Sequence, residues 1–390
     1  MDLEYLQSGT SRHFCTYTMS YKEDDSVVLK NIFKFYKTQN YDLAYLDRLD
    51  ASLNSLSLNN TKHSLTFPTN GDATCTSKVN SPAWFYIPGE DLFLVRNMLN
   101  SEVIDQLLRA SLSEWTDCTP KACNLGELCR SAHIWQDSVT DIGPDHKWEQ
   151  TLLGRLRWIT LGYHYDWTNR RYNESDRSEF PGILADVASQ IVGALRTELT
   201  DGLFAGLKNC AQLYDACAHF EPEAAIVNYY RGKTTMGFHT DEVEFDKQAP
   251  LVSISIGPTG IYLLEAQTRI QPDPHFPHTS DPTSVIPLAL RHGDVVVMLG
   301  RSRLAKHAVP AILFHHTRNG LSSEACQTAS RCAHRLCPDC SARAEITRYK
   351  QDSRICSKCI ALTDYLLSTR INMNVRQVVP YGYRFSDFAT

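Results

Sequence analysis

Hydrophobic positions recur at helical spacing in three segments of the chain. Between residues 27 and 37 the apolar side chains fall on one side of a helix with 3.6 residues per turn. These side chains are Val28, Leu29, Ile32, Phe33 and Phe35. The same spacing predicts helices over residues 102–115 and 183–203. We expect the first helix to dock onto the main domain and the other two to brace its outside.

The pattern changes beyond residue 220 to short runs of β-branched and aromatic residues interrupted by glycines and prolines. The expected strands cover residues 225–230, 251–256, 261–264, 295–299 and 371–379, with one earlier strand over 84–88. Many short strands separated by turns are typical of a jelly-roll barrel, whose mouth can hold a metal between facing strands. We therefore predict an α+β fold in which helices buttress a jelly-roll core.

Polar composition suggests where the domain begins. Residues 50–82 are rich in Ser, Asn, Thr and Lys and predict a flexible connector. The expected organisation is an N-terminal helix and connector over residues 1–82, followed by the main domain over residues 83–390. Residues 267–287 predict a long loop to which no role can be assigned.

Composition and charge narrow the class of protein. The 390 residues are 43% hydrophobic and carry a formal net charge of -5, so any surface for a polyanion must be a local patch. The N-terminus lacks the pattern of a secretory signal or transit peptide, and no apolar run reaches the roughly 18 residues of a membrane span. Thirteen cysteines without a secretion signal favour reduced thiols. We expect an intracellular protein without a membrane segment.

One set of residues has the composition of an iron site. Iron(II) that must hold an oxidant and a co-substrate together needs protein ligands at only half of its six positions, and two histidines with one carboxylate meet this need. Residues i and i+2 of a strand share a face, so a His-x-Asp triplet at a strand end supplies two ligands. His239-Thr240-Asp241 fits this requirement, with His307 as the distant third ligand.

Spacing alone does not select this triplet. His164-Tyr165-Asp166 and His292-Gly293-Asp294 have the same form. Context separates them, because His239 follows an expected strand and a glycine-bearing turn, whereas His292-Gly293-Asp294 is typical of the turn that opens the next strand. We therefore favour His239 and Asp241 as the ligands.

Two arginines provide a candidate anchor for an anionic co-substrate. Arg370 and Arg376 are six residues apart in an expected strand, so both point to one face together with Asn372. An arginine fork binds a carboxylate through two hydrogen bonds. A solvated strand edge is the alternative, but a polar asparagine on the same face of a β-rich core favours a ligand site.

Six motifs follow one another in an order that is itself informative. They are Asn228-Tyr229-Tyr230, His239-Thr240-Asp241, Ser253 to Gly257, His292-Gly293-Asp294, His307 to Pro310 and Arg370 to Arg376. In order and content this series resembles the AlkB family of dioxygenases, over residues 83–380. The stretch from Arg157 to Trp167 is similar to the branch that contains the first AlkB homologue of animals.

The resemblance implies a double-stranded β-helix in which Fe(II) is bound by His239, Asp241 and His307. It implies that 2-oxoglutarate is held by Asn228, Tyr230, Arg370, Asn372 and Arg376. It also implies a base pocket lined by Trp135, Tyr163, His164, Tyr165 and Asp166. For each aromatic residue in that pocket, packing in the core is the alternative.

The implied activity is oxidative demethylation of N-methylated bases in nucleic acid, with tRNA as the first expectation and DNA as the second. The reaction would use Fe(II), O2 and 2-oxoglutarate and release succinate, CO2 and formaldehyde. The methylated base would be unpaired or flipped out of its duplex, and stacking on aromatic side chains would compensate for its lost neighbours.

We expect a monomer. The alternatives are an oxygenase acting on a protein such as a histone tail, and an inactive scaffold, which the complete ligand set disfavours.

A second metal motif lies between His307 and Arg370, in a Cys-rich insertion expected over residues 311–368. Cys337, Cys340, Cys356 and Cys359 form C-x2-C-x15-C-x2-C, the spacing of a four-thiolate structural zinc site. Reduced cysteines in a variable loop are the alternative. Basic residues outnumber acidic ones over residues 331–359, so we expect this insertion to contact phosphates beside the active site.

Overall fold

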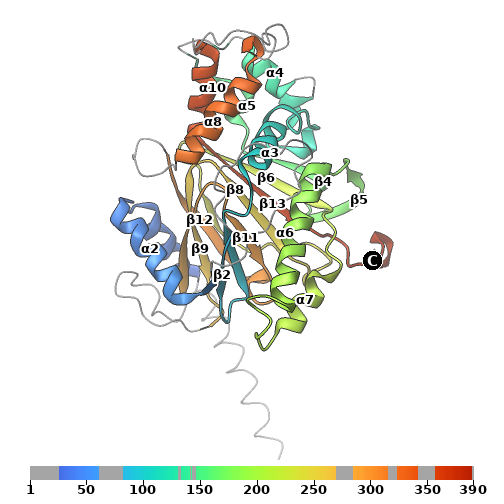
Figure 1. Ribbon diagram of the computed structural model, residues 1–390. Coiled ribbons are helices and arrows are strands. Elements are labelled where there is room, and N and C mark those ends of the chain that lie inside the picture. Colours follow the sequence, from blue (N-terminus) through green and yellow to red (C-terminus); the bar gives the residue numbers. More distant parts are fainter. Residues whose placement is uncertain are drawn as a thin grey trace, which may run out of the picture.

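The computed structural model describes residues 26–60, 82–130, 133–140, 142, 146–268, 284–314, 323–340 and 356–388. Eight consecutive strands form its centre (Figure 1). They are β6 (Ala224–Arg231), β7 (Met236–His239), β8 (Leu251–Ile256), β9 (Thr259–Glu265), β10 (Val285–Leu290), β11 (Val295–Met298), β12 (His307–Leu313) and β13 (Thr369–Arg376).

These strands divide between two facing antiparallel sheets. One contains the order β11-β8-β13-β6 and the other the order β10-β9-β12-β7. The chain crosses repeatedly from one sheet to the other, which is the connectivity of a double-stranded β-helix. The predicted α+β fold with a jelly-roll core is confirmed.

Further strands extend the larger sheet on both sides. On one edge are β3 (Leu92–Arg96), β2 (Ala83–Ile87) and β1 (Leu58–Asn60), and on the other are β4 (Trp158–Asp166) and β5 (Arg171–Arg177). The sequence predicted β2, but the hairpin of β4 and β5 was not expected as an element. This hairpin brings residues of the 157–167 stretch next to the mouth of the jelly roll.

Side-chain alternation along β13 creates a polar interior. Ile371, Met373 and Val375 point outward into the main hydrophobic core. Arg370 and Asn372, on the opposite face of the strand, line a cavity inside the barrel. The two-residue period of a strand thus gives one apolar face for the helices and one polar face for chemistry, as the sequence predicted.

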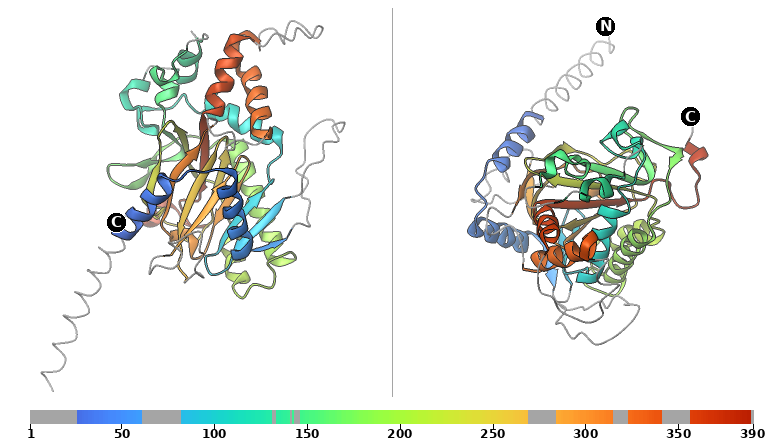
Figure 2. Two further views of the ribbon diagram at one scale, coloured as in Figure 1. Left: turned by 90° about the vertical axis from the view of Figure 1, so that its left-hand side faces the viewer. Right: turned by 90° about the horizontal axis from the view of Figure 1, so that it is seen from above.

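Helices cover the outer face of the larger sheet (Figure 1, Figure 2). The predicted helices appear as α3 (Ser101–Ser113) and α6 (Gly182–Thr200), and α7 (Cys210–Ala218) packs against α6. The side chain of Asn100 caps α3 by accepting hydrogen bonds from the backbone N–H groups of Glu102 and Val103. The apolar sides of α3 and α6 form one core with β6, β8, β11 and β13.

A second group of helices lies beyond one end of the sheets (Figure 1). It comprises α4 (Ile134–Val139), α5 (Leu152–Arg155), α8 (Ser323–Leu336) and α10 (Ser357–Leu367). The last two stand between β12 and β13 and pack against each other. Strand β12 continues to Leu313, so its last three residues overlap the start of the Cys-rich insertion expected over residues 311–368.

The N-terminal segment is more ordered than the sequence indicated. A helix over residues 26–37 matches the prediction, but α2 (Leu43–Leu56) and β1 occupy the first part of the expected connector. Leu49 and Leu53, four residues apart among polar neighbours, bury one side of α2. Both helices contribute to a core with β9, β10 and β12, so they belong to the same body as the barrel. Residues 61–81 lie outside the described residues.

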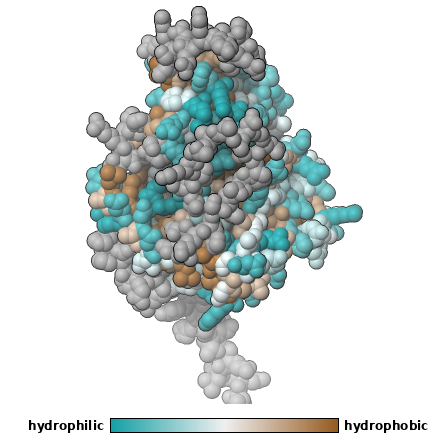
Figure 3. Space-filling model, viewed as in Figure 1, coloured by the Kyte–Doolittle hydropathy of each residue, from teal (hydrophilic) through white to brown (hydrophobic). Residues whose placement is uncertain are grey.

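Two other expectations concern surface features. Most of the predicted 267–287 loop lies outside the described residues, and its last part is strand, since β10 begins at Val285. Of the helices in the described part of the chain, none combines the length and apolarity needed to cross a membrane. Among the coloured residues in Figure 3, hydrophilic ones predominate and apolar ones form smaller patches.

Candidate active site

The three predicted metal ligands converge at the mouth of the jelly roll. His239 ends β7, Asp241 follows in the next loop, and His307 begins β12. Since β7 and β12 are antiparallel neighbours and His239 is the register partner of His307, the two imidazoles form a cross-strand pair with ring centroids 4.2 Å apart. One ligand atom from each of the three residues lies within 4.8 Å of the others.

Hydrogen bonds orient both imidazoles for metal binding. Nδ1 of His239 lies 2.9 Å from the carbonyl oxygen of Gly237, and Nδ1 of His307 lies 3.2 Å from that of Ala305. A ring that donates through Nδ1 keeps the Nε2 lone pair for a metal. Burial lowers the pKa of His307 to about 4, so this ring is neutral at neutral pH. Two imidazoles and a carboxylate on one side fit Fe(II) and leave its other positions open.

A buried network of charges holds the carboxylate ligand. Nη2 of Arg376 lies 3.3 Å from Oδ2 of Asp241, and Nη1 lies 3.1 Å from Oε1 of Glu244. Glu244 also meets Arg303 at 3.0 Å, and Arg303 donates to the backbone carbonyl of Asp241. Burial by itself raises the pKa of Asp241, but the positive charge of Arg376 outweighs it and holds that pKa below its ordinary value. Asp241 is therefore ionised and positioned.

Glu244 and Arg303 were missed by the sequence analysis. Each is about 1% exposed, so both charges depend on their mutual contact. Glu244 follows the His-x-Asp triplet by three residues, but no spacing rule marks it. Arg303 lies in a short 3-10 helix before β12. Neither residue belongs to a recognisable motif, so the only signal was their closeness in sequence to the ligands.

An inner cavity extends from the metal ligands into the barrel. Its wall includes His239, His307 and four of the five residues predicted to hold 2-oxoglutarate, which are Asn228, Tyr230, Arg370 and Asn372. The fifth, Arg376, lines the outer side and contacts Asp241 instead. The five predicted residues thus lie close together. Four of them line the inner cavity, and Arg376 positions the metal ligand Asp241.

Arg370 gives the inner cavity a positive charge. Its guanidinium donates to Ser255 Oγ at 2.7 Å and to the backbone carbonyls of Pro258 and Leu290 at 3.0 and 3.2 Å. Among the residues that the structure describes, it forms no salt bridge, and its buried Nε has no hydrogen-bond partner. Burial lowers its pKa to about 10. A buried cation without a salt-bridge partner among the described residues fits the carboxylate of a small dicarboxylic acid.

An outer cavity opens on the other side of His239. Its volume is about 600 Å³, within the range of small-molecule pockets. Tyr165 and Trp167 supply aromatic surface and Arg170 supplies positive charge, while Asp241 and Glu244 form the floor near the metal ligands. Trp167 packs edge-on against Tyr165, with ring centroids 4.7 Å apart, yet is 49% exposed. A planar base can stack on such a surface.

The other four residues predicted for the base pocket lie elsewhere. Trp135, in α4, is buried in the main core and does not line the outer cavity. His164 is buried on the opposite face of β4 and pairs with Thr160 Oγ1 at 2.9 Å. Tyr163 lines a separate surface hollow beside Arg177. Asp166 caps the β4–β5 turn by accepting hydrogen bonds from the backbone N–H groups of Thr168 and Asn169.

Side-chain alternation explains why His164 does not line the outer cavity. Neighbouring residues of a strand point to opposite faces, so Tyr165 and His164 cannot both line one pocket wall. Trp167, which ends the stretch from Arg157 to Trp167 but was not predicted to line the base pocket, lies at the outer cavity, where Trp135 was expected. The two rival triplets are also explained: Asp166 stabilises its hairpin, and Asp294 accepts from the backbone N–H of Arg291 in the turn before β11.

The basic residues of the Cys-rich insertion that the structure describes are already paired within the chain. Arg331 and Arg335, on α8, both meet the buried carboxylate of Asp105. Lys358 meets Asp339 at 3.0 Å. The expected phosphate contact therefore gains no support from these three residues, and the other basic positions of residues 341–355 lie outside the described part of the chain.

Comparison with known proteins connects this geometry to a family. The family described as the 2OG-Fe(II) oxygenase superfamily matches residues 93–376, which include the whole jelly roll and the three converging ligands. The matched region covers well over half of the chain.

Named relatives extend the similarity. "Nucleic acid dioxygenase ALKBH1" of Mus musculus is 32% identical over 280 residues, or 68% of this chain and 59% of that protein. The Homo sapiens protein of the same name is 30% identical over 285 residues, with the same shares. "tRNA demethylase abh1" of Schizosaccharomyces pombe is 32% identical over 245 residues, or 59% of this chain and 71% of that protein. The match thus spans about 59% of the length of the two mammalian relatives.

Proposed function

Because this chain belongs to the 2OG-Fe(II) oxygenase superfamily and, within it, to the AlkB family, we propose that it oxidises N-methyl groups on nucleic-acid bases. The co-substrates are O2 and 2-oxoglutarate. One oxygen atom enters succinate as CO2 is lost, and the other converts the methyl group to a hydroxymethyl group that leaves as formaldehyde. The observation that carries this proposal is that the inner and outer cavities share a wall at the metal ligand His239.

The inner cavity is the proposed site of 2-oxoglutarate. Arg370 would bind the carboxylate far from the metal, while Tyr230, Asn228 and Asn372 supply polar groups along the wall. Fe(II) held by His239, Asp241 and His307 supplies the oxidising chemistry. Arg376 and Glu244 keep Asp241 ionised and in place, so the chain's own residues preserve the ligand geometry during turnover.

The outer cavity is the proposed site of the methylated base. A base inside a duplex is out of reach, so the substrate must be single-stranded or flipped out. Tyr165 and Trp167 would stack on the base, and Arg170 lies where a phosphate or a base edge can be contacted. We place tRNA first and DNA second, since the similar yeast protein is named a tRNA demethylase and the mammalian ones nucleic acid dioxygenases.

We also propose that the protein acts as a monomer inside the cell. Light scattering of the purified chain tests whether it is a monomer, for which a mass near 44.1 kDa is expected. A concentration-independent mass of twice that value would contradict it.

A turnover assay tests the activity itself. The purified chain is incubated with Fe(II), 2-oxoglutarate and ascorbate, and formaldehyde and succinate are measured across a panel of methylated tRNA, single-stranded DNA, duplex DNA and methylated histone peptides. We expect formaldehyde release in proportion to succinate with methylated nucleic acid, and none with the His239→Ala variant. Release with the peptides alone would establish the protein-directed alternative instead.

A further inference from the structure

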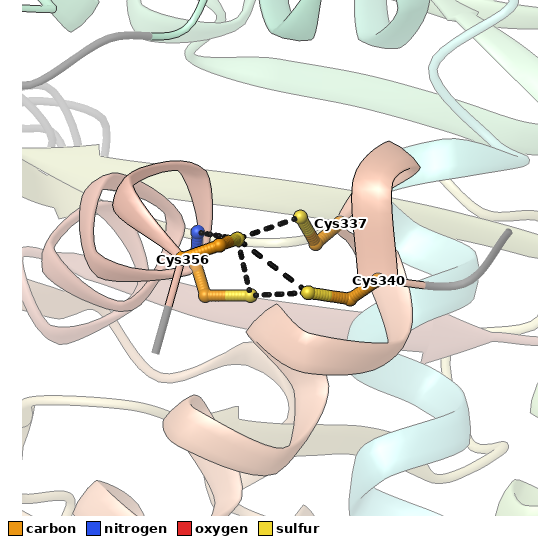
Figure 4. Close-up of side chains that lie close together, drawn as sticks. Cys337, Cys340 and Cys356 are labelled. Carbon is orange, nitrogen blue, oxygen red and sulfur yellow. Dashed lines mark hydrogen bonds between the residues drawn. The ribbon is translucent and has the colours of Figure 1, made fainter. Parts of the chain in front are cut away.

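Four cysteines meet at the end of the molecule formed by α8 and α10. Cys337 and Cys340 follow α8, and Cys356 and Cys359 lie at the first turn of α10. Figure 4 shows the side chains of Cys337, Cys340 and Cys356 pointing toward one another. All four sulfur atoms lie within 4.8 Å of each other. The two C-x2-C motifs, separated by fifteen residues in sequence, therefore share one site.

The sulfur spacing matches tetrahedral coordination. Four Sγ–Sγ distances are 3.3 to 3.5 Å, from Cys356 to each of the other three and from Cys340 to Cys359. A Zn–S bond of about 2.3 Å places tetrahedral sulfurs about 3.8 Å apart. A disulfide needs about 2.05 Å. The cluster is thus slightly tighter than a zinc-filled site and far too open for paired disulfides.

The backbone around the cysteines is suited to thiolates. Cys356 is the N-cap of α10, and its sulfur accepts a hydrogen bond from the backbone N–H of Cys359 at 3.3 Å. A helix N-terminus favours negative charge through its unpaired N–H groups and its dipole. On the other side, the N–H of Cys340 donates to the carbonyl of Cys337 at 3.1 Å, which folds the first C-x2-C into a compact turn.

We propose that Cys337, Cys340, Cys356 and Cys359 bind one structural Zn²⁺ that ties α8 to α10. This inference does not depend on the proposed function. It rests on four thiol ligands that converge from two segments fifteen residues apart, and on a four-ligand site in which no position is left for a substrate.

The position of the site indicates what the ion would stabilise. α8 is fixed to α3 by the buried carboxylate of Asp105, which meets Arg331 and Arg335. α10 ends at Leu367, and β13, which carries Arg370, begins at Thr369. Zinc at the start of α10 therefore anchors the helix whose other end leads directly into the strand that lines the inner cavity.

The experiment must separate this site from two other places that can take zinc. The iron ligands can bind Zn²⁺ adventitiously, so the metal content is measured in the His239→Ala chain. Cys118, Cys123 and Cys129 form a second group, but with three sulfurs rather than four. Cys326, also on α8 but outside both groups, provides a matched control.

Reduced protein is purified after expression with zinc in the medium, and its zinc is counted by mass spectrometry. In the His239→Ala background we expect one zinc per chain, retained in Cys326→Ser and Cys123→Ser but lost in Cys356→Ser. Replacement by Co²⁺ should give thiolate-to-cobalt charge-transfer absorption that Cys356→Ser abolishes.

Since the loss of a metal ligand can prevent folding of Cys356→Ser, a second measurement uses the unaltered cysteines. A thiol-blocking reagent should release one zinc, detected by a chromogenic chelator, and a strong chelator should lower the unfolding temperature until zinc is restored. Absence of zinc from folded, reduced protein supplied with Zn²⁺ would overturn the proposal. Loss of zinc from Cys123→Ser together with its retention by Cys340→Ser would overturn it as well.

Discussion

The guanidinium of Arg376 lies 3.3 Å from Oδ2 of Asp241, so a buried cation holds the only carboxylate of the candidate iron site. The same arginine lies 3.1 Å from Glu244, whose other oxygen meets Arg303. Asp241, Arg376, Glu244 and Arg303 thus form a chain of alternating negative and positive charges. A change in this network should therefore affect both the stability of the fold and the affinity for iron.

Removal of Glu244 tests the network. Glu244→Ala leaves Arg376 and Arg303 buried with one carboxylate fewer, and breaking a buried ion pair on one side costs about 3–5 kcal/mol of unfolding free energy. Loss of such a supporting group also typically weakens metal affinity by about 10–100-fold. Chemical denaturation and Fe(II) titration measure the two effects. Glu242→Ala, an exposed change in the same loop, should leave the unfolding free energy unchanged.

His239→Ala should abolish turnover and leave the fold intact. His239 is only half-buried and ends a short strand, so its removal loses few packing contacts. The two remaining protein ligands, Asp241 and His307, should bind Fe(II) weakly. Circular dichroism and formaldehyde release check the two statements. His133→Ala, a change at an exposed histidine in another part of the chain, should keep full activity. Retained turnover by His239→Ala would mean that another triplet binds the metal.

Arg370→Met should act on the co-substrate. The KM for 2-oxoglutarate is expected to rise by about 30-fold or more, because the truncation of one member of a buried charge pair costs at least about 2 kcal/mol. The KM for nucleic acid should change little, since Arg370 lines only the inner cavity. Steady-state kinetics with each substrate varied in turn gives the comparison. Arg301→Met, at an exposed arginine, is the control.

Substitution of two tryptophans should have different effects, one on nucleic-acid binding and the other on the stability of the fold. Trp167→Ala should weaken binding of single-stranded nucleic acid by about 1–3 kcal/mol and leave the melting temperature nearly unchanged, because Trp167 is exposed at the outer cavity. Trp135→Ala should instead lower the unfolding free energy by about 3–5 kcal/mol, because Trp135 lies in the main core. Fluorescence anisotropy and denaturation distinguish them. If Trp135→Ala weakened binding and Trp167→Ala lowered stability, the base pocket expected from the sequence would be supported.

His292 should make stability depend on pH. Burial lowers its pKa to about 4, and its Nδ1 accepts a hydrogen bond from the backbone N–H of Gly257 at 3.0 Å. Between about pH 6.5 and pH 4 the unfolded chain binds a proton at this residue and the folded chain does not. Stability is therefore lost as the pH falls through this window, by up to about 1.4 kcal/mol per pH unit.

The His292→Gln variant provides the matched comparison, since its amide oxygen can accept the same hydrogen bond without titrating. Denaturation midpoints from pH 7 to pH 4 should fall less steeply in the variant. Parallel curves for the two proteins would show that His292 does not contribute.

Local patterns in the sequence were sufficient for the elements that build the site. The alternation of polar and apolar residues from Arg370 to Arg376 predicted both the strand and its inward face. His239 and Asp241 were recognised by their spacing and by the strand before them. Helix α2 was missed because the abundance of Ser and Asn from residue 50 onward indicated a connector, although apolar residues continue at helical spacing to Leu53.

The sequence by itself determined what neighbouring residues encode: strand and helix periodicity, the ligand triplet and the paired C-x2-C motifs. The tertiary structure decided which distant residues meet, such as Glu244 with Arg303, and which tryptophan reaches the outer cavity. The physical reason is that periodicity depends on backbone geometry within a few residues, whereas a contact across the fold depends on how whole sheets and helices pack. No local pattern carries that information.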